Sequence, residues 1–438
     1  MAENRNILDD FKVNHEEKTI DTNVKLRVGI IGYGQRGSYV TIHSLHFINE
    51  MEVTAVCDLY QDRVDQGVKE NEEKYGNKVL GTLNYHDVLN SDNVDAVYVA
   101  CSWEYHIEVA IEAMKKGKIV ALEVGGAYSI DELHRLVRTY EETKTPIMFM
   151  ENCCFDKFEL LTTAAVRAGK LGKVVHCHGS YAHDLRQEIS SGNIERHYRL
   201  RNYTYRNSEN YPTHELGPIA KLLNINRGNR MLSLVSIASS AAGLEQYVKD
   251  HPELVEKDAT LDGRRFKQGD IVNTIITCVG GETILLKLDT TLPRPYYSRE
   301  FGIRGTKGFA LKDTNTIYLD GEKEYWETVE GVRESLNTAE KYEADFLPEL
   351  WTKMDPADLE SGHGGIDTLE FRVFADCVLN NKEMPIDVYD AAAWMAVTAL
   401  SEQSIAAGGA PQMVPDFTDG KWITRAPRDV VKMPEVAK

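Results

Sequence analysis

Residues 28–58 combine a short apolar run, a glycine-rich loop and a second apolar run that ends in an acid. The loop at 32–37 reads Gly-Tyr-Gly-Gln-Arg-Gly and fits the spacing GxGxxG. In such loops Gly32 allows a tight turn out of a strand, Gly34 lets the backbone approach a pyrophosphate, and Gly37 lets the next helix pack closely. The N-terminus of that helix then faces the phosphates. This stretch therefore predicts a parallel sheet that binds a dinucleotide.

The acid at the end of the second apolar run indicates which dinucleotide is bound. Asp58 follows Gly37 by 21 residues, so we expect its carboxylate to accept a hydrogen bond from a ribose hydroxyl. The same charge repels a 2′-phosphate, which favours NAD over NADP. Arg36 keeps NADP open as an alternative, and we expect Gln35 and Arg36 to lie beside the cofactor with the three glycines.

Alternating strand-like and helix-like stretches continue to about residue 150 and predict an α/β domain with a doubly wound parallel sheet. Strands are expected at 94–100, 119–124 and 147–150, and helices at 106–116 and 131–143. Together with the glycine loop, this pattern is typical of a Rossmann domain. We expect that domain at 25–150, after a polar N-terminal arm at 1–24.

After residue 151 the pattern predicts a C-terminal α+β domain with a mostly antiparallel open sheet. A helix is expected at 158–168, strands at 173–181, 271–279, 283–288 and 301–303, and loops at 201–210 and 334–365. Gly280 and Gly281 suggest a hairpin. This second domain is expected at 151–438, with a helix near 388–407 that packs back on the first domain.

Composition narrows the classes of partner. The 438 residues carry a net charge of -18, which disfavours binding to nucleic acid or to an anionic membrane surface. The seven cysteines are odd in number and show no CxxC spacing, so reduced thiols are expected. No long apolar run and no signal-peptide pattern is present, and a cytoplasmic location is expected for the chain as given.

The two-domain pattern resembles the oxidoreductase family of glucose-fructose oxidoreductase and inositol dehydrogenase. The resemblance implies that residues 102–106, with Ser102, Trp103 and His106, touch the cofactor, and that Glu123 approaches the nicotinamide ribose. That family carries Glu-Lys-Pro after its fifth strand, and the lysine serves the proton transfer that accompanies hydride transfer. Here Val124 stands in place of the lysine. Valine cannot carry a proton, so ordinary dehydrogenase chemistry is not expected.

Polar motifs in the second region narrow the resemblance. They read Glu-Asn-Cys-Cys at 151–154, Tyr-Ala-His-Asp-Leu-Arg at 181–186, Tyr-Pro-Thr-His at 211–214, Pro-Arg-Pro-Tyr-Tyr-Ser-Arg at 293–299 and Gly-His-Gly-Gly-Ile-Asp at 362–367. Together they are similar to glycoside hydrolase family 109, the NAD-dependent α-N-acetylgalactosaminidases, in which the lysine is also missing. This chain departs from the family at Glu215, where glycine is usual, and at Tyr296 and Tyr297, where one tyrosine is usual.

The resemblance implies a set of site residues in the second region. Substrate contacts are expected from Glu151, Tyr181, Arg199 and Tyr211, with Arg201 as an alternative to Arg199, and a cofactor contact from His183. Catalytic groups are expected among His214, Tyr181, Tyr211, Tyr296 and Tyr297. Histidine titrates near neutral pH, so His214 is expected to transfer the proton of the sugar C3 hydroxyl. His176 and His178 share a strand face that His183 does not, so no metal site is expected.

The resemblance also implies a reaction, to which two alternative functions remain. The expected activity is hydrolysis of terminal α-linked N-acetylgalactosamine by oxidation at C3, elimination, addition of water and re-reduction, with net retention. A sugar or inositol dehydrogenase that produces NADH is the first alternative. A cofactor-holding sensor or assembly subunit without turnover is the second. An exposed face of the antiparallel sheet is expected to allow a homodimer.

Overall fold

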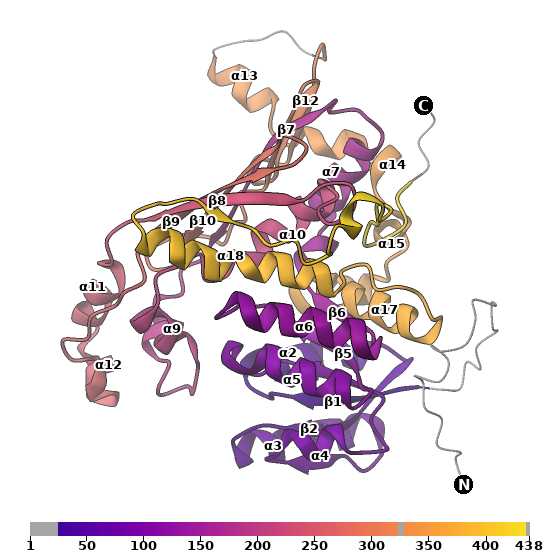
Figure 1. Ribbon diagram of the computed structural model, residues 1–438, viewed down its shortest axis with the longest axis vertical. Helices are drawn as coiled ribbons and strands as arrows, with labels where there is room; N and C mark the ends of the chain where they lie inside the picture. The colour runs from indigo at the N-terminus through magenta and orange to yellow at the C-terminus, as the bar shows by residue number, and fades with distance from the viewer. Residues whose placement is uncertain (1–24, 323–327, 435–438) are drawn as a thin grey trace. The chain divides into compact units, whose positions relative to one another are not determined.

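The computed structural model of the chain describes residues 25–322 and 328–434 and divides into two compact units (Figure 1). Of the described residues, the first unit comprises 25–124, 131–155 and 353–392, and the second comprises 125–130, 156–322, 328–352 and 393–434. The expected N-terminal arm at 1–24 lies outside the described residues. The first holds a six-stranded sheet and the second an eight-stranded sheet. Within the described ranges, no helix has both the length and the apolar character needed to cross a lipid bilayer.

The six strands of the first unit run parallel in the order β3-β2-β1-β4-β5-β6. Their bounds are β1 Leu26–Ile31, β2 Met51–Cys57, β3 Leu80–Thr82, β4 Ala96–Val99, β5 Ile119–Glu123 and β6 Ile147–Met150. The chain changes direction across the sheet between β1 and β4. Ligands of such sheets bind at this switch point, beyond the C-terminal ends of the strands. The predicted doubly wound sheet is thus confirmed.

Helices cover this sheet through apolar faces with helical spacing. They are α2 Gln35–His43, α3 Gln61–Tyr75, α4 Tyr85–Leu89, α5 Trp103–Lys115, α6 Ile130–Thr143 and α17 Ile366–Leu379. The short helix α16 Pro356–Leu359 also belongs to the first unit. In α6 the buried residues include Leu133, Leu136 and Val137, which lie on one face. Helix α5 begins three residues earlier than expected, because Trp103 and Ile107 are both buried and lie one turn apart.

The sheet of the second unit is mostly antiparallel, as predicted, in the order β13-β12-β11-β7-β10-β9-β8-β14. The strands are β7 Val174–Ala182, β8 Met231–Ala238, β9 Ile271–Cys278, β10 Thr283–Asp289, β11 Gly302–Gly305, β12 Gly308–Leu311, β13 Thr316–Leu319 and β14 Gln412–Met413. Strand β10 pairs with β9 as the expected hairpin and with β7 in parallel. The hairpin turn contains Gly281 at φ +89°, a conformation that glycine adopts without strain.

The second unit also contains helices, which lie before, between and after its strands along the chain. They are α7 Lys157–Arg167, α8 Arg186–Ser190, α9 Arg199–Tyr205, α10 Thr213–Leu222, α11 Gly243–Asp250, α12 Pro252–Lys257, α13 Val329–Glu334, α14 Glu343–Phe346, α15 Glu349–Thr352 and α18 Val388–Ala406, which starts in the first unit. The expectation of a loop at 201–205 was wrong. These residues complete α9 because Leu200, Tyr203 and Thr204 bury one helical face.

Helix α10 packs closely against strand β7 at a glycine. A Cβ added at Gly179 would lie 3.0 Å from both the Cβ and the carbonyl oxygen of Glu215. Few side chains tolerate such a contact, so glycine at 179 permits the close approach of the helix. The first turn of α10, which carries His214, is thereby held beside the C-terminal half of β7, which carries Tyr181.

Candidate functional site

The glycine loop after β1 has the shape that a dinucleotide cradle requires. Gly32 has φ +99°, and a Cβ there would lie 2.6 Å from the backbone of Ala100 and Cys101, which follow β4. A Cβ on Gly37 would lie 2.0 Å from the carbonyl oxygen of Gly32. Two glycines therefore bring the loop, the switch point and helix α2 together. Gly34 precedes α2, which begins at Gln35. A Cβ added at Gly34 would contact only the Arg63 side chain, so the backbone of Gly34 is accessible to a phosphate.

Asp58 follows β2 and is held rigidly. Its carboxylate accepts hydrogen bonds from the N–H groups of Tyr33 at 2.8 Å and Tyr60 at 3.1 Å. The Arg63 guanidinium lies 3.8 Å from Asp58 and 5.0 Å from the centre of the Tyr60 ring. The glycine cradle and this fixed acid have the chemistry and the placement that the adenosine half of a dinucleotide requires.

The loop after β4 is fixed from within. Ser102 precedes α5, and Trp103 is buried in its first turn. The Nε2–H group of His106 donates to the carbonyl oxygen of Cys101 at 2.7 Å. Burial lowers the pKa of His106, so its imidazole is neutral at pH 7. His106 therefore stabilises the conformation of the loop that carries Ser102 and Trp103, the other two predicted cofactor residues.

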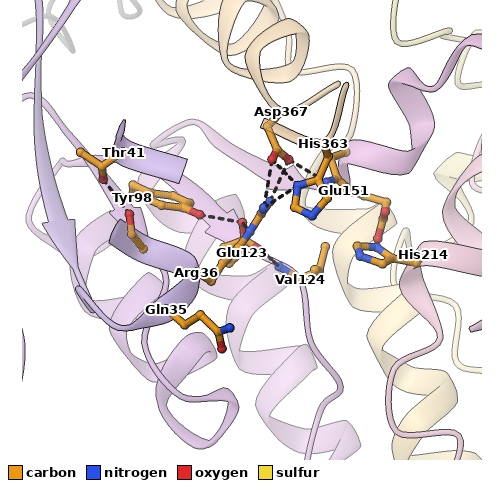
Figure 2. A network of polar contacts seen from close by, with 12 residues as sticks. Gln35, Arg36, Thr41, Tyr98, Glu123, Val124, Glu151, His214, His363 and Asp367 are labelled. Atoms are coloured by element: carbon orange, nitrogen blue, oxygen red, sulfur yellow. Dashed lines mark hydrogen bonds and ion pairs between the residues drawn. The ribbon is translucent and has the colours of Figure 1, made fainter. Parts of the chain in front are cut away.

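Arg36 lies at the centre of a polar network in the first unit (Figure 2). Its Nε donates to Glu123 Oε1 at 2.7 Å, and its two terminal nitrogens donate to Asp367 at 3.0 and 3.1 Å. Glu123 also accepts from the Tyr98 hydroxyl at 2.6 Å, and Asp367 accepts from the Asn152 amide at 2.7 Å. We call these five residues, together with His363, the Arg36 network.

Charge pairing sets the ionisation of the Arg36 network. Burial opposes ionisation of Asp367, yet the attraction of Arg36 and the hydrogen bond from His363 hold the pKa of this carboxyl well below its ordinary value. His363 Nδ1 lies 2.6 Å from Asp367 Oδ2. Val124, at the position of the missing lysine, is buried, and its N–H donates to Glu123 Oε2 at 3.1 Å. The sequence indicated Arg36 and Glu123 as site residues, but not their links to Asp367 and Tyr98.

Glu151, the remaining site residue predicted in the first unit, follows strand β6. It is fully buried. Its Oε1 accepts a hydrogen bond from the N–H of Cys153 at 3.2 Å, which orients the carboxylate at the C-terminal edge of the sheet, where ligands of doubly wound folds bind.

In the second unit, rings from three segments meet in what we call the tyrosine–histidine cluster, made of Tyr181, His183, Tyr211, His214 and Tyr297. The ring centres of Tyr181 and Tyr211 are 4.6 Å apart, and that of His214 lies 5.6 and 4.8 Å from them. The Tyr211 hydroxyl lies 3.4 Å from His214 Nε2. Tyr211 lies just before α10, and Pro212 at the N-cap already has helical backbone angles of φ −72° and ψ −16°. Residues 211 and 214 therefore lie on one face.

The structure distinguishes between residues that the sequence left as alternatives. The Tyr297 ring lies 6.0 Å from Tyr181 and 5.3 Å from His183. Tyr296 is 60% exposed and lies over Arg294. Tyr297 is thus the tyrosine of the pair that joins the cluster.

Arg199 borders the tyrosine–histidine cluster. Its guanidinium lies 5.1 Å from the centre of the Tyr211 ring and 3.1 Å from Glu188. Arg201 is exposed on the same helix, so Arg199 is the arginine that reaches the cluster. Burial and the nearby Arg199 charge lower the pKa of His183, so this imidazole is neutral at pH 7.

Family models match both parts of the chain. Residues 26–150 match the oxidoreductase family with an NAD-binding Rossmann fold, and residues 155–424 match the C-terminal domain of glycosyl hydrolase 109. The first match indicates a nicotinamide cofactor, in agreement with the glycine cradle.

Similar proteins extend over most of the chain. An α-N-acetylgalactosaminidase of Tannerella forsythia is 35% identical over 92% of this chain and 88% of its own length. A glycosyl hydrolase family 109 protein of Solibacter usitatus is 37% identical over 92% of this chain and 91% of its own length.

Solved structures share the fold at low identity. Levoglucosan dehydrogenase in complex with NADH and levoglucosan has a TM-score of 0.65 at 15% identity, covering 89% of this chain and 100% of that one. An oxidoreductase from Agrobacterium radiobacter with NAD+, L-tartaric acid and magnesium has a TM-score of 0.63 at 15% identity, covering 89% of this chain and 99% of that one.

Proposed function

Because the chain belongs to glycosyl hydrolase family 109, a family of glycosidases, we propose that it removes terminal α-linked N-acetylgalactosamine with net retention. It uses NAD as a cofactor that is recycled in each turnover. The observation that carries this proposal is the buried Val124 in a unit whose glycine cradle for a dinucleotide is intact. The name of the Tannerella relative supports the choice of sugar.

NAD rather than NADP is supported by the charges around the cradle. The Asp58 carboxylate lies at the end of β2, where it would repel a 2′-phosphate. Arg36, the cation that could have offset this repulsion, is paired with Glu123 and Asp367. Arg63 lies 3.8 Å from Asp58, so its charge is balanced by the same acid.

When bound, NAD supplies a reversible acceptor for the electron pair of the sugar C3–H bond. The N-terminus of α2 and the backbone at Gly34 would hold the pyrophosphate, and Asp58 would hold the adenosine ribose. The chain then has to accept the C3 hydroxyl proton, remove the C2 proton that the C3 ketone acidifies, and protonate the departing oxygen. No lysine is available at 124 for the first of these steps.

His214 accepts the C3 hydroxyl proton in this proposal. Its Nε2 lies 3.4 Å from the Tyr211 hydroxyl, and this neighbour restricts the orientation of the imidazole. Tyr181 and Tyr297 offer phenol groups for the C2 proton and the leaving oxygen. Arg199 and Glu151 bind sugar hydroxyl or acetamido groups.

A single incubation separates this proposal from its rival. The NAD-loaded protein is mixed with p-nitrophenyl α-N-acetylgalactosaminide in deuterated water. We expect release of nitrophenol, no net NADH, and deuterium at C2 of the sugar. Release without deuterium at C2 would overturn the oxidation–elimination route. NADH that accumulates from free sugars, without nitrophenol release, would establish the dehydrogenase instead.

The role of His214 is tested with a matched pair of variants. His214→Ala should lower kcat by about 100-fold or more, the usual contribution of a general base, and leave NAD binding unchanged in calorimetry. His176→Ala is the control, because His176 lies on β7 outside the cluster and bonds to Thr283. Near-normal turnover of His214→Ala would remove this residue from the mechanism.

A further inference from the structure

Two glutamates of the second unit, Glu209 and Glu215, have buried carboxyl groups without a cationic partner. Glu209 is 0% and Glu215 is 1% exposed, and among the described residues neither forms an ion pair with lysine or arginine. Lys287 lies on β10, and its backbone contacts Glu215. Its Nζ group is paired with Glu300 at 2.6 Å, so its charge is directed to another acid. Two ionised carboxylates in such a dry environment would repel each other strongly.

The hydrogen bonds of the two carboxyl groups are incomplete in a way that one proton would correct. Both oxygens of Glu209 and Oε1 of Glu215 are buried without a well-formed hydrogen bond. An ionised carboxylate can only accept hydrogen bonds, so two of them cannot bond to each other. The two carboxyl groups face each other. A proton on either one turns it into a donor to the other. This arrangement costs far less than two buried charges.

The same carboxyl groups reach the backbone that carries the cluster tyrosines. Glu215 Oε2 accepts from the N–H of Lys287 at 3.2 Å, and this carboxyl also faces the N–H of Tyr181. The Glu209 carboxyl faces the N–H groups of Tyr211 and Leu288. Leu288 is paired with Tyr181 in the ladder between β10 and β7. The carboxyl pair therefore connects the two tyrosine backbones.

The main chain of Glu209 is also anchored. Its N–H donates to the Ser401 hydroxyl at 2.9 Å, and its carbonyl oxygen accepts from the Thr398 hydroxyl at 2.8 Å. Glu215 lies in the first turn of α10, next to His214, and contacts the sheet at Gly179. These attachments fix the backbone positions from which the two carboxyl side chains extend.

We propose that Glu209 and Glu215 share one proton and act as positioning residues for Tyr181 and Tyr211, a role that rests on the proposed function of the tyrosine–histidine cluster. The protonated partner donates to the ionised one, and the pair carries a single negative charge. The rings of Tyr181 and Tyr211 are thereby held at their 4.6 Å separation.

The pair gives the cluster a defined response to pH. Burial raises the pKa of Glu209 to about 8, and burial together with repulsion from Glu209 raises the pKa of Glu215. Loss of the shared proton at alkaline pH therefore places two negative charges side by side. The other titratable groups on the packed elements are His176, Cys177, His178 and Tyr181 on β7, His214 and Lys221 on α10, and Lys287 and Asp289 on β10, with His183 just after β7 and Tyr211 just before α10. Replacement of Glu215 by glutamine leaves these groups in place and exchanges the titratable donor for an amide that donates at every pH.

Infrared spectroscopy of the full-length, NAD-loaded protein tests the shared proton without any substrate. We expect a band from a protonated carboxyl group at pH 7 that disappears in Glu209→Gln/Glu215→Gln. Glu370→Gln is the control, since burial and the nearby Glu123 and Asp367 also raise the pKa of Glu370, which lies in the first unit. This variant should lose only the separate absorption of Glu370 and keep the band of the pair. Spectra of the double variant that match the wild type at this band would overturn the proposal.

Kinetics test the positioning role. Glu215→Leu should lower kcat/KM by roughly 10- to 100-fold through displaced tyrosines, whereas Glu215→Gln, which can donate to Glu209, should restore most of it. The alkaline fall in kcat/KM should be weaker in Glu215→Gln than in the wild type. Equal activity of Glu215→Leu and the wild type would overturn the role. Absence of glycosidase activity in the wild type would refute the proposed function alone, because the infrared result does not depend on turnover.

Discussion

Arg36 and Asp367 are joined by two hydrogen bonds of 3.0 and 3.1 Å although 331 residues separate them in the chain. Asp367 is 0% exposed, and the Arg36 side chain is 29% exposed. The pair connects the glycine loop after β1 with the start of α17, and it holds Glu123 on its other side.

Loss of this ion pair should destabilise the first unit. Asp367→Asn leaves the Arg36 charge with one buried partner fewer, and we expect the free energy of unfolding to fall by about 3 kcal/mol. Asp376→Asn on the same helix is the control, because Asp376 and Lys382 form a pair at the surface and such pairs contribute about 1 kcal/mol or less. Urea denaturation measures both. Equal losses in the two variants would show that the network does not contribute.

The difference in stability between the wild type and Asp367→Asn should depend on pH. The folded-state pKa of Asp367 is lowered, mainly by Arg36 acting against the effect of burial, so its contribution is present above the unfolded pKa of about 3.9 and is lost as the pH falls below it. The difference in stability between wild type and Asp367→Asn should therefore be constant from pH 6 to 8, within about 0.5 kcal/mol, and shrink under more acidic conditions. A difference that grows as the pH falls would contradict this assignment.

Asp58 should set the preference between the two nicotinamide dinucleotides. Asp58→Asn removes the charge that repels a 2′-phosphate, and we expect NAD to bind about tenfold more weakly while NADP binds more tightly. Asp65→Ala, an exposed acid on α3, should change neither affinity. Isothermal calorimetry with each dinucleotide measures the ratio, and an unchanged ratio in Asp58→Asn would argue against the role of this acid.

Gly32 should be much less replaceable than a glycine with similar backbone angles. Gly32 and Gly76 have φ of +99° and +71°, but only Gly32 has backbone atoms within 2.6 Å of an added Cβ, whereas Gly76 has none within 4 Å. We expect Gly76→Ala to cost about 1 kcal/mol of stability and Gly32→Ala about 3 kcal/mol or more, with loss of NAD binding. Thermal unfolding with and without NAD distinguishes these outcomes. Retained NAD binding in Gly32→Ala would show that the loop can relax.

The neighbouring tyrosines at 296 and 297 should differ in function. Tyr297→Phe removes a hydroxyl beside Tyr181 and His183, and we expect kcat/KM to fall by roughly 100-fold if this phenol transfers a proton. Tyr296→Phe should stay within about twofold of wild type, because that ring lies beside Arg294 and outside the tyrosine–histidine cluster. Steady-state rates on the nitrophenyl glycoside decide between them, and the reverse order would assign the role to Tyr296.

Local patterns explain why much of the first unit could be predicted. Gly32, Gly37 and Asp58 are constrained by neighbours within one strand–helix–strand stretch, so their spacing in the sequence already contains the geometry. The mostly antiparallel sheet was also predictable, because alternating burial along β9 leaves a period of two in the sequence.

Long-range contacts account for what could not be predicted. Asp367 was visible only as part of a polar motif, and nothing in its sequence neighbourhood indicates that it pairs with Arg36. The choice between Tyr296 and Tyr297 depends on where the chain bends after β10, which a run of two tyrosines does not reveal. The carboxyl pair of Glu209 and Glu215 likewise follows from the packing of α10 on β7.

The absence of a side chain at Gly179 also has a consequence for engineering this protein. Any larger residue there would push Glu215 outward and tilt the first turn of α10, so that His214 would lose its alignment with Tyr211. Libraries that search for new sugar specificities should therefore leave position 179 untouched. They can vary the exposed stretch around Tyr296, where the backbone is not wedged against a helix.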